Sequence, residues 1–276
     1  MATYSTTDIR NIALVGHASS GKTMLTEALM YKAGVIGEMG RPGDLMSDFT
    51  EEEQEHGHSL FNAVVHCDYQ GRHINLIDTP GAADFIGQTI SAMPAVETVA
   101  VVINAQAGVE SSTRRLMRRS KDRNLCRMIV VNKIDAEGVD LPDLLKSIQE
   151  AFGKECLPVN LPAQGGKAVV DCFFNPSGES DFGSVEAAHT AIVEQVVEVD
   201  EKLMEVYLDQ GDVKPDQLHE PFERALREGH LVPICFTAAH PHNAPNEPVG
   251  IEALLDVFVK LAPNPLVGNP RPFLKG

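Results

Sequence analysis

Residues 16–23 constrain the fold of this chain more than any other stretch, because they have the spacing G-x-x-x-x-G-K-[ST]. An apolar run at residues 12–15 precedes them, and residues 24–30, with apolar side chains at helical spacing, follow them. A glycine-rich turn between a strand and a helix directs several backbone N–H groups, and the positive end of the helix, toward one place. The sequence therefore predicts a phosphate-binding loop.

We expect every residue of this turn to contact a bound nucleotide: Gly16, His17, Ala18, Ser19, Ser20, Gly21, Lys22 and Thr23. The Lys22 ammonium supplies a charge to the β- and γ-phosphates, which also makes it a candidate catalytic residue, and the Thr23 hydroxyl can ligate Mg²⁺. A glycine-rich turn that binds nothing is the alternative, and the motifs that follow in order argue against it.

A second motif, D-T-P-G, ends the apolar strand expected at residues 73–78 and consists of Asp78, Thr79, Pro80 and Gly81. An aspartate at this place can hold the Mg²⁺ shell through water. Gly81 lets the backbone approach the γ-phosphate, and its N–H can bond that phosphate only while it is present. The pattern predicts a nucleotide-dependent switch with Gly81 as a second candidate catalytic residue, and a chance turn is the alternative.

A third motif, N-K-x-D, follows the apolar run at residues 129–131 and consists of Asn132, Lys133, Ile134 and Asp135. The Asp135 carboxylate can accept from both N1–H and the exocyclic amine of guanine, whereas adenine lacks this donor pair. Asn132 can bond the far edge of the base and brace the phosphate loop, and the Lys133 stem can lie along one ring face. Thr237 and Ala238 are the expected last guanine contact, through the backbone N–H of Ala238.

Apolar runs and helical periodicity alternate along most of the chain, which is the pattern of an α/β protein. Strands are expected at residues 12–15, 63–68, 73–78, 98–103, 127–131 and 232–236, and helices at 24–30, 111–123, 141–152 and 250–262. Short strands within residues 159–175, a long acidic helix at 184–208 and a helix at 214–228 interrupt this rhythm. We predict an α/β P-loop GTPase domain with a mostly parallel six-stranded central sheet flanked by helices, plus a small α+β insertion subdomain before the last strand.

The predicted domain division follows from this pattern. Residues 1–155 and 231–265 form the GTP-binding domain, residues 156–230 form the inserted subdomain, and residues 266–276 begin a following domain. Residues 34–59 form a long polar loop, which is expected to be functional or mobile. Its acidic run at residues 51–55 is equally compatible with a solvated helix face.

Charge and composition limit the partners. The net charge of −16 and the pI of about 5.0 argue against electrostatic binding of nucleic acid over the whole protein surface. The basic residues of the helix at 111–123 wrap around much of it, which favours a solvated face over an RNA patch. We expect a monomer without direct sequence-specific nucleic-acid binding.

Five scattered cysteines, no apolar stretch of about 20 residues and no secretory signal pattern predict a cytoplasmic protein that does not enter a membrane. The pairs His56/His58 and His240/His242 could ligate a metal, but no third ligand follows at a suitable spacing. We therefore expect no structural metal at either pair.

These residues together resemble the GTP-binding domain of elongation factor G over essentially the whole chain. Residues 53–59, E-Q-E-H-G-H-S, resemble the family's E-Q-E-R-G-I-T, residues 78–85, D-T-P-G-A-A-D-F, resemble D-T-P-G-H-V-D-F, and residues 104–110, N-A-Q-A-G-V-E, resemble D-A-V-A-G-V-E. The insertion, with E-K-L-M-E-V-Y-L at residues 201–208, looks like the extra subdomain of that factor. The resemblance implies GTP and GDP as ligands, Mg²⁺ as the metal, and the ribosome as the partner in protein synthesis.

Two departures from the family pattern bear on the chemistry. Ser59 stands where the family has its Mg²⁺-ligating threonine, and serine keeps the hydroxyl. Ala82, a candidate nucleotide contact, stands where the family has a histidine that positions the attacking water, and a methyl group can neither hydrogen-bond nor polarise that water. We therefore expect tight GTP binding with very slow intrinsic hydrolysis, as in a divergent paralogue, unless His56 or His58 substitutes.

Three hypotheses from different classes follow. The first is a translational GTPase of the elongation factor G type, and the second is a guanine-nucleotide-sensing binding module without significant hydrolysis. The third is a P-loop kinase or ATPase, against which the N-K-x-D motif argues.

Overall fold

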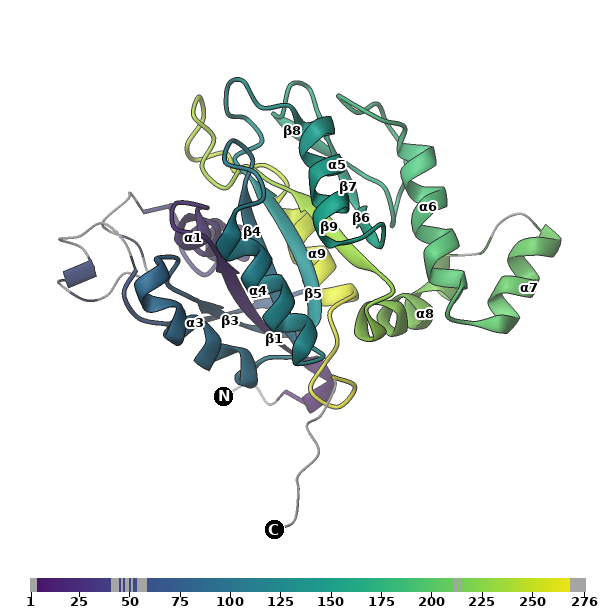
Figure 1. The fold of residues 1–276 in the computed structure, drawn as a ribbon, viewed down its shortest axis with the longest axis horizontal. Helices are drawn as coiled ribbons and strands as arrows, with labels where there is room; N and C mark the ends of the chain where they lie inside the picture. The colour runs from purple at the N-terminus through teal and green to yellow at the C-terminus, as the bar shows by residue number, and fades with distance from the viewer. Residues whose placement is uncertain are drawn as a thin grey trace, which may run out of the picture.

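The computed structural model describes residues 4–40, 45, 47, 50, 52–53, 59–210, 213 and 215–268. Its main feature is a seven-stranded sheet in the order β2-β3-β1-β4-β5-β9-β6, accompanied by a two-stranded sheet, β7-β8 (Figure 1). The strands are β1 (Ile9–Gly16), β2 (Ala63–Tyr69), β3 (Arg72–Asp78), β4 (Thr98–Asn104), β5 (Cys126–Asn132), β6 (Cys156–Pro158), β7 (Asn160–Ala163), β8 (Ala168–Asp171) and β9 (Val232–Phe236). The helices are α1 (Lys22–Lys32), α3 (Ile86–Ala92), α4 (Ser111–Asp122), α5 (Leu141–Phe152), α6 (Val185–Val197), α7 (Glu201–Gln210), α8 (Pro215–Glu228) and α9 (Ile251–Lys260).

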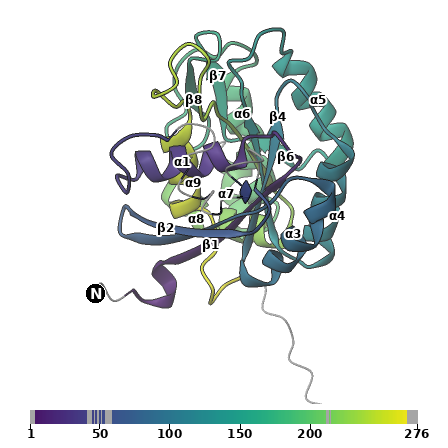
Figure 2. The ribbon, with the colours of Figure 1, turned by 90° about the vertical axis from the view of Figure 1, so that its left-hand side faces the viewer.

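Helices cover both faces of the large sheet. α1 packs against α9 on one face and α4 packs against α5 on the other, with the sheet between the two pairs (Figures 1 and 2). The strands β5 and β9 are buried along their whole length, because a parallel strand between two helical layers has no solvated face. The predicted α/β fold with a mostly parallel sheet is confirmed. No helix in the described ranges is both long and apolar enough to cross a membrane.

The sheet has seven strands rather than the predicted six, and the additional one is β6. β6 lies in the region assigned to the insertion, yet it pairs in parallel with β9, with Leu157 opposite Pro233. Three residues that include a proline give almost no strand signal, and an edge position tolerates the missing N–H of Pro158. Only the pairing with a distant part of the chain makes this segment a strand.

The hairpin predicted from two apolar runs is confirmed. β2 and β3 pair antiparallel from Ala63 opposite Asp78 to Tyr69 opposite Arg72. The other strand pairs described within the large sheet are parallel. As a result, β1, β3 and β5 end at the same edge of the sheet, and this edge carries the three sequence motifs.

The single helix predicted at residues 184–208 is instead two helices, α6 and α7. The break has a physical cause in Asp200, whose carboxylate oxygen accepts hydrogen bonds from the N–H groups of Lys202 and Leu203, both at 3.1 Å. An aspartate that satisfies the free N–H groups of a following turn begins a new helix. Apolar residues continue at helical spacing through both α6 and α7, so the sequence pattern gives no sign of the boundary between them.

Asn160, at the start of β7, connects the small sheet to β9 through two hydrogen bonds. Its side chain is 1% exposed, its Oδ1 accepts from the backbone N–H of Phe236 at 2.7 Å, and its Nδ2 donates to the carbonyl of the same residue at 3.2 Å. One amide thus satisfies both backbone groups of a buried strand residue.

Replacing Asn160 with alanine should lower the free energy of unfolding by about 2 kcal/mol, because a buried N–H and C=O lose their partners. Urea unfolding followed by circular dichroism measures the change. Asn175→Ala, at an exposed asparagine, is the matched control and should change it by less than about 0.5 kcal/mol. Equal effects of the two substitutions would contradict this role for Asn160.

Candidate functional site

The turn between β1 and α1 is too tight for side chains at its glycines. A Cβ atom on Gly16 would lie 2.3 Å from the Val102 carbonyl oxygen, and one on Gly21, whose φ is +89°, would lie 2.5 Å from Nδ2 of Asn132. Ser19 adopts a φ of +62°, which is unusual for a residue with a Cβ atom. The predicted phosphate loop is therefore a closely packed backbone turn at the end of a buried strand.

Lys22 lies under this turn and is 5% exposed. Its Nζ donates to the carbonyls of Gly16 at 3.1 Å and His17 at 3.0 Å. Desolvation by burial lowers the pKa of Lys22 from 10.5 to about 8, although the negative charge of Asp78 acts in the opposite direction. A buried ammonium held by loop carbonyls is a favourable partner for a phosphate oxygen.

The D-T-P-G segment lies directly against the phosphate loop. β3 is the parallel neighbour of β1, with Asp78 opposite Leu14, and the Thr79 hydroxyl donates to the Leu14 carbonyl at 2.8 Å. A Cβ atom on Gly81 would lie 2.5 Å from Nζ of Lys22 and 2.6 Å from the backbone N of Ala18. Only glycine fits between these atoms, and the Pro80 carbonyl beside it is held by the Thr89 hydroxyl at 2.9 Å.

The oxygen atoms expected to hold Mg²⁺ lie in the same region. The hydroxyls of Thr23 and Ser59 are 3.0 Å apart, although 36 residues separate them in the chain. The Asp78 carboxylate is 1% exposed and accepts from the Ser47 hydroxyl at 3.3 Å. Two hydroxyls and a buried carboxylate are hard oxygen donors, so these residues fit a magnesium ion that keeps several waters.

Glu53 holds the segment that follows Ser59, a role that the sequence did not indicate. This carboxylate is 1% exposed, and its Oε1 accepts from the N–H groups of Leu60 at 2.9 Å and Phe61 at 3.1 Å. Burial raises the pKa of Glu53, but these hydrogen bonds outweigh it and the net pKa is lowered. His56 and His58, the candidate substitutes for the water-positioning histidine, lie outside the described residues.

The N-K-x-D segment braces the phosphate loop, as predicted for Asn132. This residue is 1% exposed, its Nδ2 donates to the Ser20 carbonyl at 3.1 Å, and its Oδ1 accepts from the Ala239 N–H at 3.0 Å. Lys133, with a φ of +65°, donates from Nζ to the Ser19 carbonyl at 3.0 Å. The Lys133 stem therefore extends across the loop.

The remaining residues predicted to contact the base lie beside this segment. The N–H of Ile134 donates to the Thr237 carbonyl at 3.2 Å, and Asp135 accepts from the N–H of His242 at 2.7 Å. The N–H of Ala238 donates to the Val249 carbonyl at 3.0 Å, and its contact with a base oxygen stays a prediction. Strand-like pairing of Ala238 with Val249 was not visible in the sequence.

Ala82 is half-buried and precedes the short helical turn Ala83–Phe85. Its carbonyl accepts from the Phe85 N–H at 3.1 Å, and its methyl group offers no donor or acceptor. Position 82 therefore lies beside Gly81 without a group that could orient water.

Two further residues support the loop, and both lie in the stretch N-A-Q-A-G-V-E. Asn104 donates from Nδ2 to the Ser19 carbonyl at 3.5 Å, and Glu110 lies 3.2 Å from Nδ1 of His17. The stretch resembles the family's D-A-V-A-G-V-E, but nothing in its local sequence indicates these contacts. Their partners are more than 80 residues away in the chain, and only the pairing of β1 with β4 brings them together.

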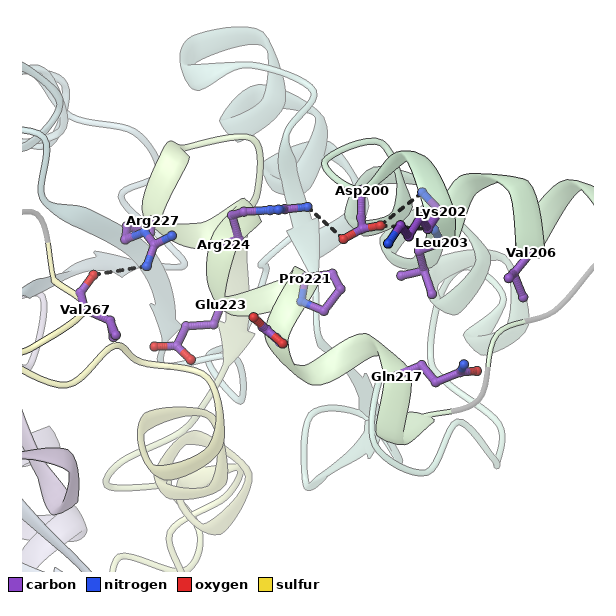
Figure 3. Close-up of a pocket in the computed structure, with 11 residues that line it drawn as sticks. Asp200, Lys202, Leu203, Val206, Gln217, Pro221, Glu223, Arg224, Arg227 and Val267 are labelled. Atoms are coloured by element: carbon purple, nitrogen blue, oxygen red, sulfur yellow. Dashed lines mark hydrogen bonds and ion pairs between the residues drawn. The ribbon is translucent and has the colours of Figure 1, made fainter.

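A cavity of about 640 Å³ lies far along the chain from these motifs, between α7, α8 and Val267 (Figure 3). Arg224 forms an ion pair with Asp200 at 3.1 Å at one side, and Arg227 donates to the Val267 carbonyl at 3.3 Å at the other. None of the residues that line this cavity belongs to the predicted site, so the cavity is not part of the candidate site. Among the described residues, no cluster of three or more His, Cys, Asp or Glu side chains could hold a metal ion, His240 and His242 included.

A parallel sheet with a tight glycine turn, a buried lysine and a base-site segment at one edge defines the class of P-loop nucleotide-binding domains. Residues 7–264 match the family model described as the elongation factor Tu GTP binding domain, and the chain belongs to this family of translational GTPase domains. The resemblance inferred from the motifs is thereby confirmed.

Known relatives agree with this assignment. An elongation factor G-like protein of Thermotoga maritima is 29% identical over 270 residues, which cover 94% of this chain and 38% of the relative. A peptide chain release factor 3 of Streptococcus agalactiae is 30% identical over 274 residues, which cover 93% of this chain and 50% of the relative. A crystal structure of a Thermus thermophilus protein is 33% identical with a TM-score of 0.82, over 94% of this chain and 41% of that one. The chain thus spans half or less of the length of these relatives.

The lowered pKa of Lys22 predicts an unusual pH dependence of stability without nucleotide. The unfolded chain keeps the Lys22 proton up to about pH 10.5, whereas the folded chain releases it near pH 8, so unfolding takes up a proton between these values. The free energy of unfolding should therefore rise with pH across this window relative to Lys22→Met. Parallel pH profiles of the two proteins in urea unfolding would contradict the shift, and saturating GDP should abolish it because the phosphates favour the charged amine.

Proposed function

We propose that this chain is the GTP-binding domain of an elongation factor G-like translational GTPase, and that it alternates between GTP and GDP forms with Mg²⁺. The observation that carries the proposal is the connection through Asn132, which joins the phosphate loop to the segment that contains Asp135. A phosphate loop alone would suit many nucleotides. The addition of a carboxylate placed to accept from guanine selects GTP and GDP over ATP.

The geometry supports the following binding roles. The N–H groups of residues 16–23 and the Lys22 ammonium would bind the phosphates, and Thr23, Ser59 and, through water, Asp78 would hold Mg²⁺. The metal, when bound, neutralises charge on the phosphates. Asp135 would exchange its hydrogen bond from the His242 N–H, now 2.7 Å, for the two donors of guanine.

Gly81 and Ser59 are the two moving contacts of the proposed switch. In this structure the Gly81 backbone is close to Lys22 and Ala18, where the γ-phosphate of GTP would approach the loop. The γ-phosphate would therefore have to move the Gly81 turn, and its loss would let the turn return. This dependence on one phosphate would distinguish the GTP form from the GDP form.

Intrinsic hydrolysis is proposed to be slow, because Ala82 stands where the resemblance implies a water-positioning histidine. Without a side chain to orient water beside the γ-phosphate, the domain keeps its charge-stabilising groups but loses a positioning group. A guanine-nucleotide-sensing module without significant turnover is the second candidate function, and the same residue favours it.

The wider setting is also proposed from the family. We propose a ribosomal partner, a cytoplasmic location and a monomeric state, with residues 1–155 and 231–265 as the GTP-binding domain and 156–230 as an inserted subdomain. Residues 266–276 are proposed to begin a following domain.

Comparison of the protein with its Ala82→His variant tests the proposal. Both should bind GDP and GTP with similar affinity and prefer them to ATP in a competition titration. Single-turnover GTP hydrolysis should be very slow in the protein as it stands and faster by at least about tenfold in Ala82→His, in the range that a positioned acid–base group contributes. The rates are measured with and without ribosomes.

Gly87→His, at an exposed glycine of α3 near the same segment, is the control and should leave the rate unchanged. Rapid turnover by the unmodified protein would contradict the role given to Ala82. Absence of guanine-nucleotide binding would overturn the proposed function as a whole.

A further inference from the structure

A band of positive charge covers α4 and the start of β5, in a chain whose net charge is −16. We call it the α4 basic surface, and its members are Arg114, Arg115, Arg118, Arg119, Lys121, Arg123 and Arg127. Asp122 is the one acidic residue within α4. In Figure 1, α4 lies on the front of the sheet with α5 beside it, away from the inserted helices α6 and α7.

The cations follow the geometry of the helix. Arg114, Arg118 and Lys121 are three or four residues apart and share one face, while Arg115 and Arg119 form an adjacent row. All five are exposed, and in the part of the chain that the structure describes none of them forms an ion pair. Like charges at this spacing repel one another, so the surface is destabilising unless an anion joins it.

A pocket of about 260 Å³ lies at the inner edge of this surface. It is lined by Arg114, Arg118, Lys121 and Arg127 around an apolar floor of Met117, Ala151 and Phe152. Four cations converge on this one cavity, between α4 and the last turn of α5. Its described lining contains no acidic side chain.

Arg127 is the observation that turns a charged helix face into a binding site. It is 7% exposed and lines the pocket, yet across the described ranges its side chain has no hydrogen-bond or ion-pair partner. Its Nη2 lies close to Gly229, just past the end of α8, where the helix dipole favours a cation without supplying a counter-ion. A largely buried arginine that lines a pocket without a counter-ion is an unfavourable arrangement, which an incoming anion would offset.

We propose that the α4 basic surface binds the phosphate backbone of RNA without reading its sequence. Arg127 would bind one phosphate in the pocket. The exposed cations of α4 would bind the neighbouring phosphates along the RNA strand. Six of the seven cations are arginines, whose planar fork matches phosphate oxygens bidentately.

RNA fits this surface better than an acidic protein does. Protein interfaces are depleted of charge at their centre and carry large apolar anchors, whereas nucleic-acid interfaces are strongly positive. The exposed large apolar side chains of the described residues are Tyr4, Val35, Phe61, Val64, Leu208 and Leu266, none of which lies on α4. The overall negative charge does not prevent binding, because charges beyond about 8 Å are screened at physiological ionic strength.

The sequence alone favoured a solvated helix face here. The structure favours a binding site instead because of Arg127. This residue lies in the next strand, at the start of an apolar run, and only the fold shows that it is buried next to α4. This inference does not depend on the proposed GTPase function.

The test measures binding of a fluorescein-labelled single-stranded RNA of mixed sequence by anisotropy, from 50 to 200 mM salt. The double variant Arg114→Glu/Arg118→Glu should weaken RNA binding at least tenfold. It should also reduce the slope of log affinity against log salt by about 1.4, since each phosphate that is no longer neutralised lowers this slope by about 0.7. Arg127→Lys should weaken binding less, because it keeps the charge and loses the fork.

Lys167→Glu/Lys202→Glu is the matched control, since both lysines are exposed in the inserted region and the charge change is the same. It should bind RNA like the unmodified protein. GDP affinity and the urea unfolding midpoint, measured on the same samples, should not change in either double variant, which separates this inference from the nucleotide site.

Several outcomes would overturn the inference. They are absence of RNA binding by the unmodified protein at 50 mM salt, and an equal loss of binding in both double variants. Tighter binding of a labelled oligoglutamate peptide would instead assign the surface to an acidic protein. Binding of inorganic phosphate at the pocket without binding of RNA would reduce it to a site for a free anion.

Discussion

The buried amide of Asn132 connects the parts of the candidate site that the chain supplies separately. It donates to the Ser20 carbonyl in the phosphate loop and accepts from the Ala239 N–H after β9, so one side chain joins three segments. Both bonds lie in a region closed to water, where an unpaired amide would be costly. The position of the loop, the position of the base-site segment and the end of β9 therefore depend on one another.

Lys22 provides the positive charge of the same site. Its ammonium is buried beneath the loop and its pKa is lowered to about 8, so the site without phosphate carries an unfavourable charge. Gly81 approaches the same nitrogen so closely that no side chain fits. A bound phosphate would stabilise Lys22 and displace Gly81 together, which couples ligand charge to the shape of the segment that contains Ala82.

Residues 156–230, which the sequence predicts to be an insertion, contact the site more closely than their separate sheet suggests. Asn160 fastens β7 to Phe236 at the end of β9, and a Cβ atom on Gly166, in the β7–β8 turn, would lie 2.7 Å from the Ile134 carbonyl oxygen. The start of β7 thus contacts β9, and the β7–β8 turn lies against the N-K-x-D segment.

The sequence by itself determined the α/β class, the phosphate loop, the hairpin and the base-site motif, because each depends on local spacing of residue types. The tight turn at residues 16–23 needs glycine whatever the rest of the chain does, so its motif can be recognised locally. The helix over residues 141–152 likewise has the predicted bounds. Tertiary structure decided what depends on distant partners. Examples are the strand at β6, the engagement of the Ala238 N–H by Val249, and the supports from Asn104 and Glu110. Such contacts cannot be predicted from local sequence, because they form between groups that come together only in the folded sheet.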